Sequence, residues 1–339
     1  MNEIYEEITN SKTILLLSHE SPDGDAIGSL MACFNMLKDL KKDVDVVIPE
    51  APSTFTYLDG FSEVKEKSDK QYDLAFVLDC ANKERIGEIN DEFKRCKKSI
   101  VIDHHISNTK YGNINHVEGN TASCCQVLYY LFKKWNIKIT KSIGEALITG
   151  SLTDTSGFRN NNVDRDTFIM AAELIDLGID IHNIYFLSVS KKSMAQYMLM
   201  KMTLDRLEMF ADGKIAFSYV SEEDLANVGA LPGDHEGLVD LGRNIGGVEV
   251  SLFMREDNGY RISFRSNGKI DVNEIAKKFG GGGHKMAAGA RVKGDFKETK
   301  EKLILETMKE LSKWLMVLLL LINLWDTPVE MSLTLLERV

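Results

Sequence analysis

Four short apolar runs in the first third of the chain constrain its fold most strongly. They are rich in Val, Ile and Leu and cover residues 13–18, 43–48, 73–79 and 99–103. Continuous apolar runs of this length are typical of strands that are buried on both faces, as in a parallel sheet. Between the first two runs, residues 25–42 have apolar residues at helical spacing. This alternation predicts an α/β fold with right-handed crossovers and helices on both faces of the sheet.

The character of the sequence changes near residue 190. Before it, further helices are expected over 122–135, 142–152, 165–177 and 181–187. After it, a Met-rich charged segment predicts a connecting helix, and runs typical of a smaller α+β unit follow. The expected organisation is an N-terminal domain over 1–189, a linker helix over 190–211, a second domain across a cleft over 212–313, and an atypical apolar tail over 314–339.

Charge and cysteine content exclude some classes of protein. The net charge of −10 argues against binding of long duplex DNA, because such binding requires a basic face on the protein. Five scattered Cys without a CxxC pair are typical of reduced thiols, and the acidic N-terminus lacks the features of a signal peptide, so we expect a cytoplasmic protein. The apolar stretch 314–325 is shorter than the ~20 residues that span a bilayer, which favours a packed helix over a membrane partner.

Candidate metal ligands stand at the ends of several apolar segments. They are His19, Asp23, Asp25, Asp79, Asp103, His104, His105 and Asp154. Ligands of an open parallel sheet bind beyond the carboxyl ends of the strands, so these side chains are expected to converge. A single Asp at such a position is more often a turn former or a helix cap, and Asp25 as a cap of the helix that follows is the alternative. The recurrence of such residues at the ends of four apolar segments favours a metal site.

The chemistry of this set indicates hydrolysis of a phosphate ester. Six of these residues supply four carboxylates (Asp23, Asp25, Asp79 and Asp154) and two imidazoles (His19 and His104). This donor set suits two hard divalent ions, manganese or magnesium, better than zinc or copper. Two such ions, about 3.5–4 Å apart, clamp a phosphoryl group and activate water. The sequence has no GxSxG and no Walker pattern that would indicate another mechanism.

Five motifs resemble, in chain order, those of the DHH phosphoesterases with a DHH-associated C-terminal domain. They are SHESPDGDAIGS (18–29), VLD (77–79), VIDHH (101–105), LTDTSGF (152–158) and FGGGGHKMAAGA (279–290). The resemblance extends over residues 1–312 and is greatest to the bacterial nano-RNase/pAp-phosphatase subgroup. It implies a manganese-dependent hydrolase that trims short oligoribonucleotides to 5′-mononucleotides and converts 3′-phosphoadenosine 5′-phosphate (pAp) to AMP.

The resemblance also implies a role for each candidate residue. Asp79 bridges two manganese ions, for which magnesium or cobalt are substitutes. The first ion is held by His19, Asp23 and Asp79, and the second by Asp25, Asp79, His104 and Asp154. His105 faces the scissile phosphate as donor or acid, and Asp103 orients the histidine pair. The segment 121–131 departs from the family pattern with Cys124, Cys125 and Gln126, which affects packing near the site.

A glycine run in the C-terminal part indicates where substrate binds. Backbone N–H groups of residues 280–283 can approach an anion closely, whereas a flexible hinge, or a helix cap at Gly280, is the alternative. The adjoining His284 and the nearby Arg265 favour phosphate binding, since Arg grips phosphate bidentately. Candidate substrate-binding residues are Arg243, Arg265, Ser266, Gly281, Gly282, Gly283 and His284.

Several functions remain open at this point. A phosphodiesterase acting on cyclic di-AMP or its linear product is the nearest alternative. A nucleotide sensor that binds without cutting is less consistent with the complete ligand set. Manganese pyrophosphatases lack the glycine run, and exonucleases of the RecJ type need a further domain. The preferred substrate, the cleavage polarity, activity on DNA and a homodimer are not decided by the sequence.

Overall fold

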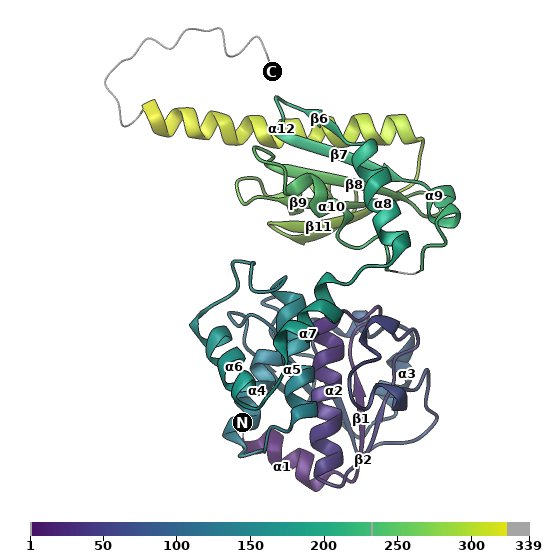
Figure 1. Cartoon of the computed structure of the whole chain (residues 1–339), viewed down its shortest axis with the longest axis vertical. Coiled ribbons are helices and arrows are strands. Elements are labelled where there is room, and N and C mark those ends of the chain that lie inside the picture. Colours follow the sequence, from purple (N-terminus) through teal and green to yellow (C-terminus); the bar gives the residue numbers. More distant parts are fainter. Residues whose placement is uncertain (1, 232, 324–339) are drawn as a thin grey trace. The chain divides into compact units, whose positions relative to one another are not determined.

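A five-stranded parallel sheet forms the centre of the N-terminal unit. The computed structural model describes residues 2–231 and 233–323, and the chain divides into two units between Lys191 and Lys192 (Figure 1). The strands of the first sheet are β1 (Thr13–Leu17), β2 (Asp43–Val46), β3 (Leu74–Leu78), β4 (Lys98–Asp103) and β5 (Ile114–Val117). Their order is β2–β1–β3–β4–β5, with all neighbours parallel. The four predicted strands are therefore confirmed, and β5 is an addition.

The strand order creates a topological switch point between β1 and β3. Strand β2 pairs with one side of β1 and β3 pairs with the other side, so the direction of winding reverses there. In open α/β sheets, ligands bind beyond the carboxyl ends of the strands at such a point. The loops that leave β1 and β3 carry His19 and Asp79. The topology therefore directs these two candidate ligands toward the same edge.

Helices cover the two faces of this sheet unequally. The helices are α1 (Asn2–Asn10), α2 (Gly24–Asp39), α3 (Asn90–Lys94), α4 (Cys124–Lys134), α5 (Lys141–Asp154), α6 (Arg165–Asp176) and α7 (Ile181–Tyr185). One face, which includes Ile14 and Leu16, forms a large core with α1, α2 and α4–α7. The alternate residues Leu15 and Leu17 face a smaller core with α3 and a 3₁₀ segment. The predicted α/β architecture with helices on both faces is confirmed.

A six-stranded mixed sheet forms the centre of the second unit. Its order is β10–β11–β9–β8–β7–β6, and only β7 and β8 run parallel among the described strands. The strands are β6 (Glu208–Phe210), β7 (Ile215–Val220), β8 (Val250–Glu256), β9 (Tyr260–Ser266), β10 (Gly282–His284) and β11 (Ala287–Val292). The helices are α8 (Met194–Asp205), α9 (Glu222–Asn227), α10 (Leu238–Arg243), α11 (Val272–Lys277) and α12 (Phe296–Asn323).

The two faces of the second sheet have different partners. On one face, Leu252 and Phe264 form a core with α11 and α12. On the other face, Phe253 packs with residues of α8 and α10. Because side chains alternate along a strand, odd-numbered residues of β8, β9 and β11 share this second face. We call it the polar face, since Ser263, Arg265 and Gly289 lie on it.

Two expected segments differ from the prediction. The helix expected over 190–211 is shorter, because α8 ends at Asp205 and β6 then pairs with β7. Helix α12 continues without interruption through the start of the predicted apolar tail, and Trp314 packs against the second core. Residues 324–339 of that tail lie outside the described residues. Within the described part of the chain, no helix combines the length and apolar character needed to cross a membrane.

Helices α2 and α5 approach each other most closely at Gly28. A Cβ atom at this position would lie 2.6 Å from the carbonyl oxygen of Ala146 and 2.8 Å from the amide nitrogen of Gly150. Both neighbours are backbone atoms, so the helices must separate to admit a methyl group. We expect Gly28→Ala to lower the free energy of unfolding of the N-terminal unit by about 2 kcal/mol in denaturant titrations.

Gly246→Ala is the matched control for this substitution. A Cβ atom at Gly246 would meet no heavy atom within 4 Å, so we expect a change below about 0.5 kcal/mol. Equal stability of Gly28→Ala and the unsubstituted protein would contradict the close packing of the two helices.

Candidate metal centre

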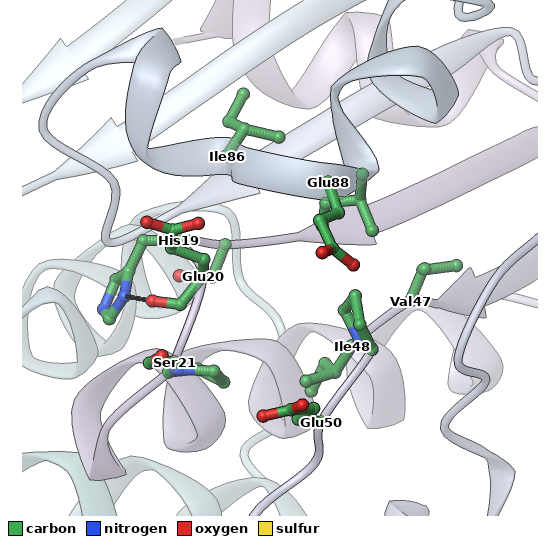
Figure 2. A pocket seen from close by; sticks show the side chains of 12 residues that line it. His19, Glu20, Ser21, Val47, Ile48, Glu50, Ile86 and Glu88 are labelled. Carbon is green, nitrogen blue, oxygen red and sulfur yellow. Dashed lines mark hydrogen bonds between the residues drawn. The ribbon is translucent and has the colours of Figure 1, made fainter. Parts of the chain in front are cut away.

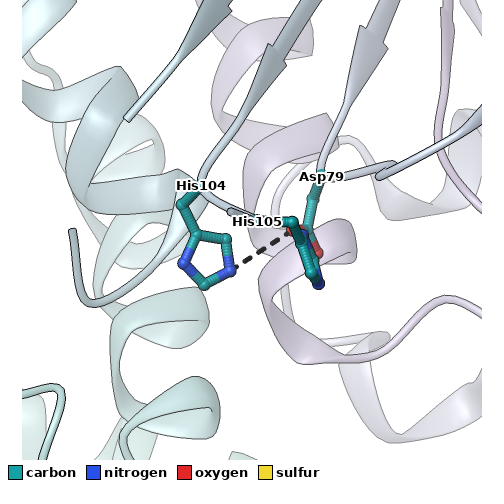
Figure 3. Close-up of side chains that lie close together, drawn as sticks. All are labelled: Asp79, His104 and His105. Atoms are coloured by element: carbon teal, nitrogen blue, oxygen red, sulfur yellow. Dashed lines mark ion pairs between the residues drawn. The ribbon is translucent and has the colours of Figure 1, made fainter. Parts of the chain in front are cut away.

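Candidate ligands converge beyond the carboxyl ends of β1, β3 and β4. Their donor atoms form three groups within which all atoms lie less than 4.8 Å apart: His19 with Asp23 and Asp79, Asp25 with His104 and Asp154, and Asp79 with His104 and His105. Asp79 belongs to two of these groups, and Figure 3 shows its side chain beside the two histidines. The structure therefore gathers residues that are far apart in the sequence around one buried carboxylate.

Two aspartates also bind helix N-termini. Asp23 is the N-cap of α2, and its Oδ1 atom accepts the N–H groups of Asp25 and Ala26. The carboxylate of Asp25 is buried and accepts the N–H groups of Cys124 (2.6 Å) and Cys125 (3.0 Å), at the start of α4. The alternative that Asp25 caps the helix following it is therefore wrong, because Asp23 does so. Both carboxylates are fixed by backbone donors and the helix dipole.

Hydrogen bonds fix the tautomers of two histidines. Nδ1 of His19 lies 2.8 Å from the carbonyl oxygen of Glu20, and Nδ1 of His104 lies 3.1 Å from that of Thr121. A carbonyl oxygen only accepts, so each Nδ1 carries the proton and each Nε2 presents a lone pair. Nε2 of His104 lies 3.6–3.8 Å from carboxylate oxygens of three aspartates: Asp25, Asp79 and Asp154.

His105 is held differently from the other two histidines. Its Nδ1 lies 2.7 Å from Oδ1 of the buried Asp103, so this nitrogen is not available to a metal ion. Oδ2 of Asp103 accepts a hydrogen bond of 2.6 Å from Asn108. Burial disfavours the charged form of Asp103, but these hydrogen bonds outweigh it and lower the pKa of its carboxyl group. The anionic Asp103 therefore orients His105 through Nδ1.

Asn108 is a residue that the motif analysis missed. Its amide donates to Asp103 and to the carbonyl oxygen of Cys80 (3.1 Å), while its own oxygen accepts the N–H of Lys110. It therefore ties the loop after β4 to the loop after β3. The signal was present, since Asn108 stands three residues after the histidine pair in VIDHHISN.

The carboxylates of the centre repel one another. Burial, followed by the charges of neighbouring aspartates, raises the pKa of Asp79 well above its ordinary value. The same two causes raise the pKa of Asp154 to about 7. Burial lowers the pKa of His19, which keeps this imidazole neutral. Oδ1 of Asp79 is buried and has no hydrogen-bond partner among the described residues. The site is incomplete without added positive charge.

Divalent ions fit this arrangement. An octahedral ion with ligand distances of about 2.1 Å separates its donor atoms by about 3.0–4.2 Å. The 3.6–3.9 Å separations between histidine Nε2 atoms and carboxylate oxygens lie in this range and are too long for hydrogen bonds. Hard oxygen donors with some imidazole suit manganese or magnesium. The unpartnered oxygen of Asp79 then has a cation to bind.

A cavity of about 170 Å³ adjoins His19 (Figure 2). Its apolar lining includes Val47 and Ile48, which follow β2. Three carboxylates also line it, those of Glu20, Glu50 and Glu88. Like charges repel, so this cavity is an unfavourable place for a phosphate group. The cavity lies beside the carboxylate cluster and is a separate feature.

Two of the seven C-terminal candidates, Arg265 and His284, lie on one row of the second sheet. Arg265 on β9 is opposite Ala287 on β11, which is opposite His284 on β10, so the three share the polar face. Arg243, at the end of α10, lies 3.0 Å from Oδ1 of Asp240, and Arg265 lies 4.0 Å from the same oxygen. The two arginines therefore stand on either side of one carboxylate.

Ser266 and the glycine run have structural roles as well. Ser266 is fully buried, and its Oγ accepts the N–H of Gly268 in the turn after β9. Gly282–His284 form the edge strand β10, not a free loop. A Cβ atom at Gly281 would lie 2.1 Å from the carbonyl oxygen of Gly289. Glycine is therefore required where the two backbones of this hairpin meet, and Gly280, with φ of 71°, follows α11 in the left-handed region.

The sequence matches two protein families over most of its length. Residues 13–151 match the DHH family, N-terminal domain, and residues 212–313 match the DHHA1 domain. The chain therefore carries a DHH family N-terminal domain followed by a DHHA1 domain. The resemblance inferred from the five motifs is confirmed.

Particular relatives cover nearly the whole chain. A Thermus thermophilus protein named bifunctional oligoribonuclease and PAP phosphatase NrnA is 29% identical over 304 residues, covering 88% of this chain and 90% of its own. The protein of the same name from Bacillus subtilis is 27% identical, covering 86% and 92%. The crystal structure of an exopolyphosphatase-related protein from Bacteroides fragilis superposes with a TM-score of 0.85 at 28% identity, covering 92% and 95%.

Removing one charge from the centre should stabilise the metal-free protein. Asp79→Asn keeps a side chain that tolerates the left-handed backbone at this position, where φ is 52°, and relieves repulsion among buried carboxylates. We expect a higher thermal midpoint than that of the unsubstituted protein in the presence of a chelator.

The same substitution should remove most of the gain in thermal midpoint on adding manganese, because Asp79 belongs to two of the three groups of candidate donor atoms. Asp39→Asn, an exposed carboxylate at the end of α2, is the control and should keep that gain. A chelated Asp79→Asn protein that melts below the unsubstituted one would contradict this account.

Proposed function

We propose that the chain is a manganese-dependent phosphoesterase that hydrolyses short oligoribonucleotides to 5′-mononucleotides and converts pAp to AMP. The observation that carries the proposal is the convergence of His19, Asp23, Asp25, Asp79, His104 and Asp154 on one edge of the first sheet. The names of the Thermus and Bacillus relatives support the choice of substrates. The hard donor set supports manganese, with magnesium or cobalt as substitutes.

In this proposal the ligands divide between two ions that share Asp79. His19, Asp23 and Asp79 would hold one ion, and Asp25, Asp79, His104 and Asp154 would hold the other. When bound, two such ions supply charge stabilisation to a phosphoryl group and lower the pKa of water. The protein contributes rigidity, because backbone N–H groups fix the carboxylates of Asp23 and Asp25 before any ion arrives.

His105 would supply the proton that the leaving oxygen requires. Its Nδ1 is committed to Asp103, so Nε2 is the atom that can give a proton to substrate. Asp103 would hold the ring so that Nε2 faces the substrate, and Asn108 holds Asp103 in place. Loss of a general acid typically costs a factor of about 10²–10⁴ in rate.

The DHHA1 domain would hold a phosphate of the substrate. Arg265 and His284 share a row of the polar face, with only the methyl group of Ala287 between them. The side chain of Arg265 is 31% exposed, and its Nε lies 4.0 Å from Oδ1 of Asp240. Its Nη1 donates a hydrogen bond of 3.1 Å to the carbonyl oxygen of Phe264. The guanidinium therefore has donors left for an anion with two oxygens.

A substrate panel with manganese tests the proposed activity. The panel contains dinucleotide RNA, a 24-nucleotide RNA, pAp, cyclic di-AMP and pyrophosphate. We expect turnover of dinucleotide RNA and pAp, and a much lower rate on the long RNA. His105→Ala should lower the rate on dinucleotide RNA by about 100-fold or more, with two ions still bound, since Nδ1 of His105 is not a ligand.

Each outcome of the substrate panel supports or contradicts a particular function. Preference for cyclic di-AMP would favour the alternative phosphodiesterase, and equal rates on the dinucleotide and the 24-nucleotide RNA would contradict selection for short chains. Binding of nucleotide without any turnover would identify a sensor.

Replacing Arg265 with Lys tests the phosphate contact of the second domain. Lys keeps the charge but loses the planar pair of donors, so we expect KM for pAp to rise about tenfold while kcat changes little. Arg165→Lys, at a side chain that is 85% exposed on α6, is the control and should change neither constant. An unchanged KM for Arg265→Lys would remove this residue from the proposed site.

A further inference from the structure

Three arginines occupy directly opposed positions on three neighbouring strands of the C-terminal sheet. Arg255 on β8 pairs with Arg261 on β9, and Arg261 pairs with Arg291 on β11. All three are odd-numbered residues of the polar face. Like charges directly opposite one another destabilise a sheet. This row, which we call the arginine row, therefore costs folding free energy unless an anion lies against it.

One carboxylate partly compensates the arginine row. Oδ2 of Asp257 lies 3.2 Å from Nη2 of Arg255, 2.8 Å from Nε of Arg261 and 3.2 Å from Nη2 of Arg291. Three positive charges against one negative charge leave the cluster with a net charge of about +2. Each guanidinium has five N–H donors, so one shared oxygen leaves many of them for another acceptor.

Two further observations indicate an electropositive site. Nε of Arg255 is buried and has no hydrogen-bond partner among the described residues. Burial, together with the charges of Arg255 and Arg261, lowers the pKa of His235 to about 4, although Asp257 and Asp234 act in the opposite direction. His235 is therefore a neutral imidazole at neutral pH beside the arginine row. Arg261 and Arg291 are 56% and 50% exposed and can reach a ligand in solvent.

The polar face is open between the arginine row and Arg265. Ser263 and Gly289 are opposite each other midway between them. A Cβ atom at Gly289 would meet only one heavy atom within 4 Å, at 3.6 Å, so nothing covers this strand here. Arg261 and Arg265 are four residues apart on β9, which corresponds to about 14 Å. Because Arg261 lies against Asp257 and Arg265 faces Asp240, we take the two arginines as contacts for different phosphates of an extended nucleotide chain.

We propose that the arginine row is a second phosphate subsite, which binds the backbone of oligoribonucleotides too long to be held by Arg265 alone. This inference rests on the proposed function, because it takes Arg265 as the first phosphate contact. Phosphate suits the row because its several oxygens can accept from three guanidinium groups at once. The subsite would discriminate by length, since a 5′-phosphorylated dinucleotide, the form used in the test, has only one phosphate besides the scissile one, and this phosphate occupies the Arg265 end only.

Equilibrium binding to the full chain tests the second subsite. Unlabelled 5′-phosphorylated di- and pentanucleotide RNA are titrated calorimetrically in the presence of a chelator, so that no hydrolysis occurs. Arg261→Gln/Arg291→Gln removes two exposed charges and leaves Arg255 paired with Asp257. We expect the double variant to bind the pentanucleotide about tenfold more weakly than the unsubstituted chain does, and the dinucleotide with a Kd within about twofold. The slope of log K against log salt concentration for the pentanucleotide should be smaller in magnitude by about 1.4.

Lys309→Gln is the matched control. It removes a positive charge from α12, which covers the opposite face of the sheet, and should leave both affinities unchanged. Arg261→Lys/Arg291→Lys should keep most of the salt slope but recover only part of the affinity, because Lys lacks the planar donor pair.

Three results would overturn the proposal of a second subsite. The first is an unchanged affinity of the Gln double variant for the pentanucleotide, and the second is an equal loss of affinity for the dinucleotide and the pentanucleotide. The third is the absence of pentanucleotide binding by the unsubstituted chain. The proposed function fails separately, through absence of dinucleotide turnover with manganese. A double variant that turns over dinucleotide normally but binds pentanucleotide weakly supports both.

Discussion

The centre of the N-terminal unit depends on the burial of one carboxylate without a partner. Asp79 is 2% exposed, its Oδ1 atom lacks a hydrogen bond among the described residues, and its backbone is in the left-handed region. Each of these features costs free energy in isolation. Around it, Asp25 and Asp154 add charges of the same sign, and both have raised pKa values. Bound cations would offset the charge repulsion and give the unpaired oxygen of Asp79 a partner, which is why the ligand set is informative about function.

The first sheet was predictable because each of its four predicted strands lies in an apolar run of the sequence, a pattern that can be read without knowing which distant residues the strand contacts. Residues 74–78 are all buried, and an apolar run is the direct consequence of burial on both faces. Strand β5 escaped prediction because Ile114–Val117 is an edge strand of half-buried residues with mixed composition. The switch point between β1 and β3 followed from strand pairing, which no local pattern encodes. It determines that His19 and Asp79 meet.

The second domain was harder to predict for a related reason. The hairpin of β10 and β11 is built from Gly and Ala, which carry little strand propensity, and it depends on close backbone approach at Gly281 and Gly283. The glycine run was interpreted as a loop, whereas its backbone pairs with β11. The role of Asn108 was missed because its contact with Asp103 depends on side-chain direction, which motif spacing does not give. Ser266 illustrates the reverse error, since a position next to Arg265 points to the opposite face.

The overall net charge of −10 conceals two local environments of opposite sign. In the N-terminal unit, the aspartates around Asp79 attract cations and, without them, repel a phosphate ester. In the C-terminal unit, the polar face presents Arg265 at one end and Arg261 with its neighbours at the other. If the proposed function holds, a phosphate-bearing substrate would be attracted by the second unit unconditionally and by the first only after metal binding. Metal binding would then be a condition for chemistry and not for capture. This separation would explain how an acidic protein can act on an acidic substrate without a basic surface along its whole length.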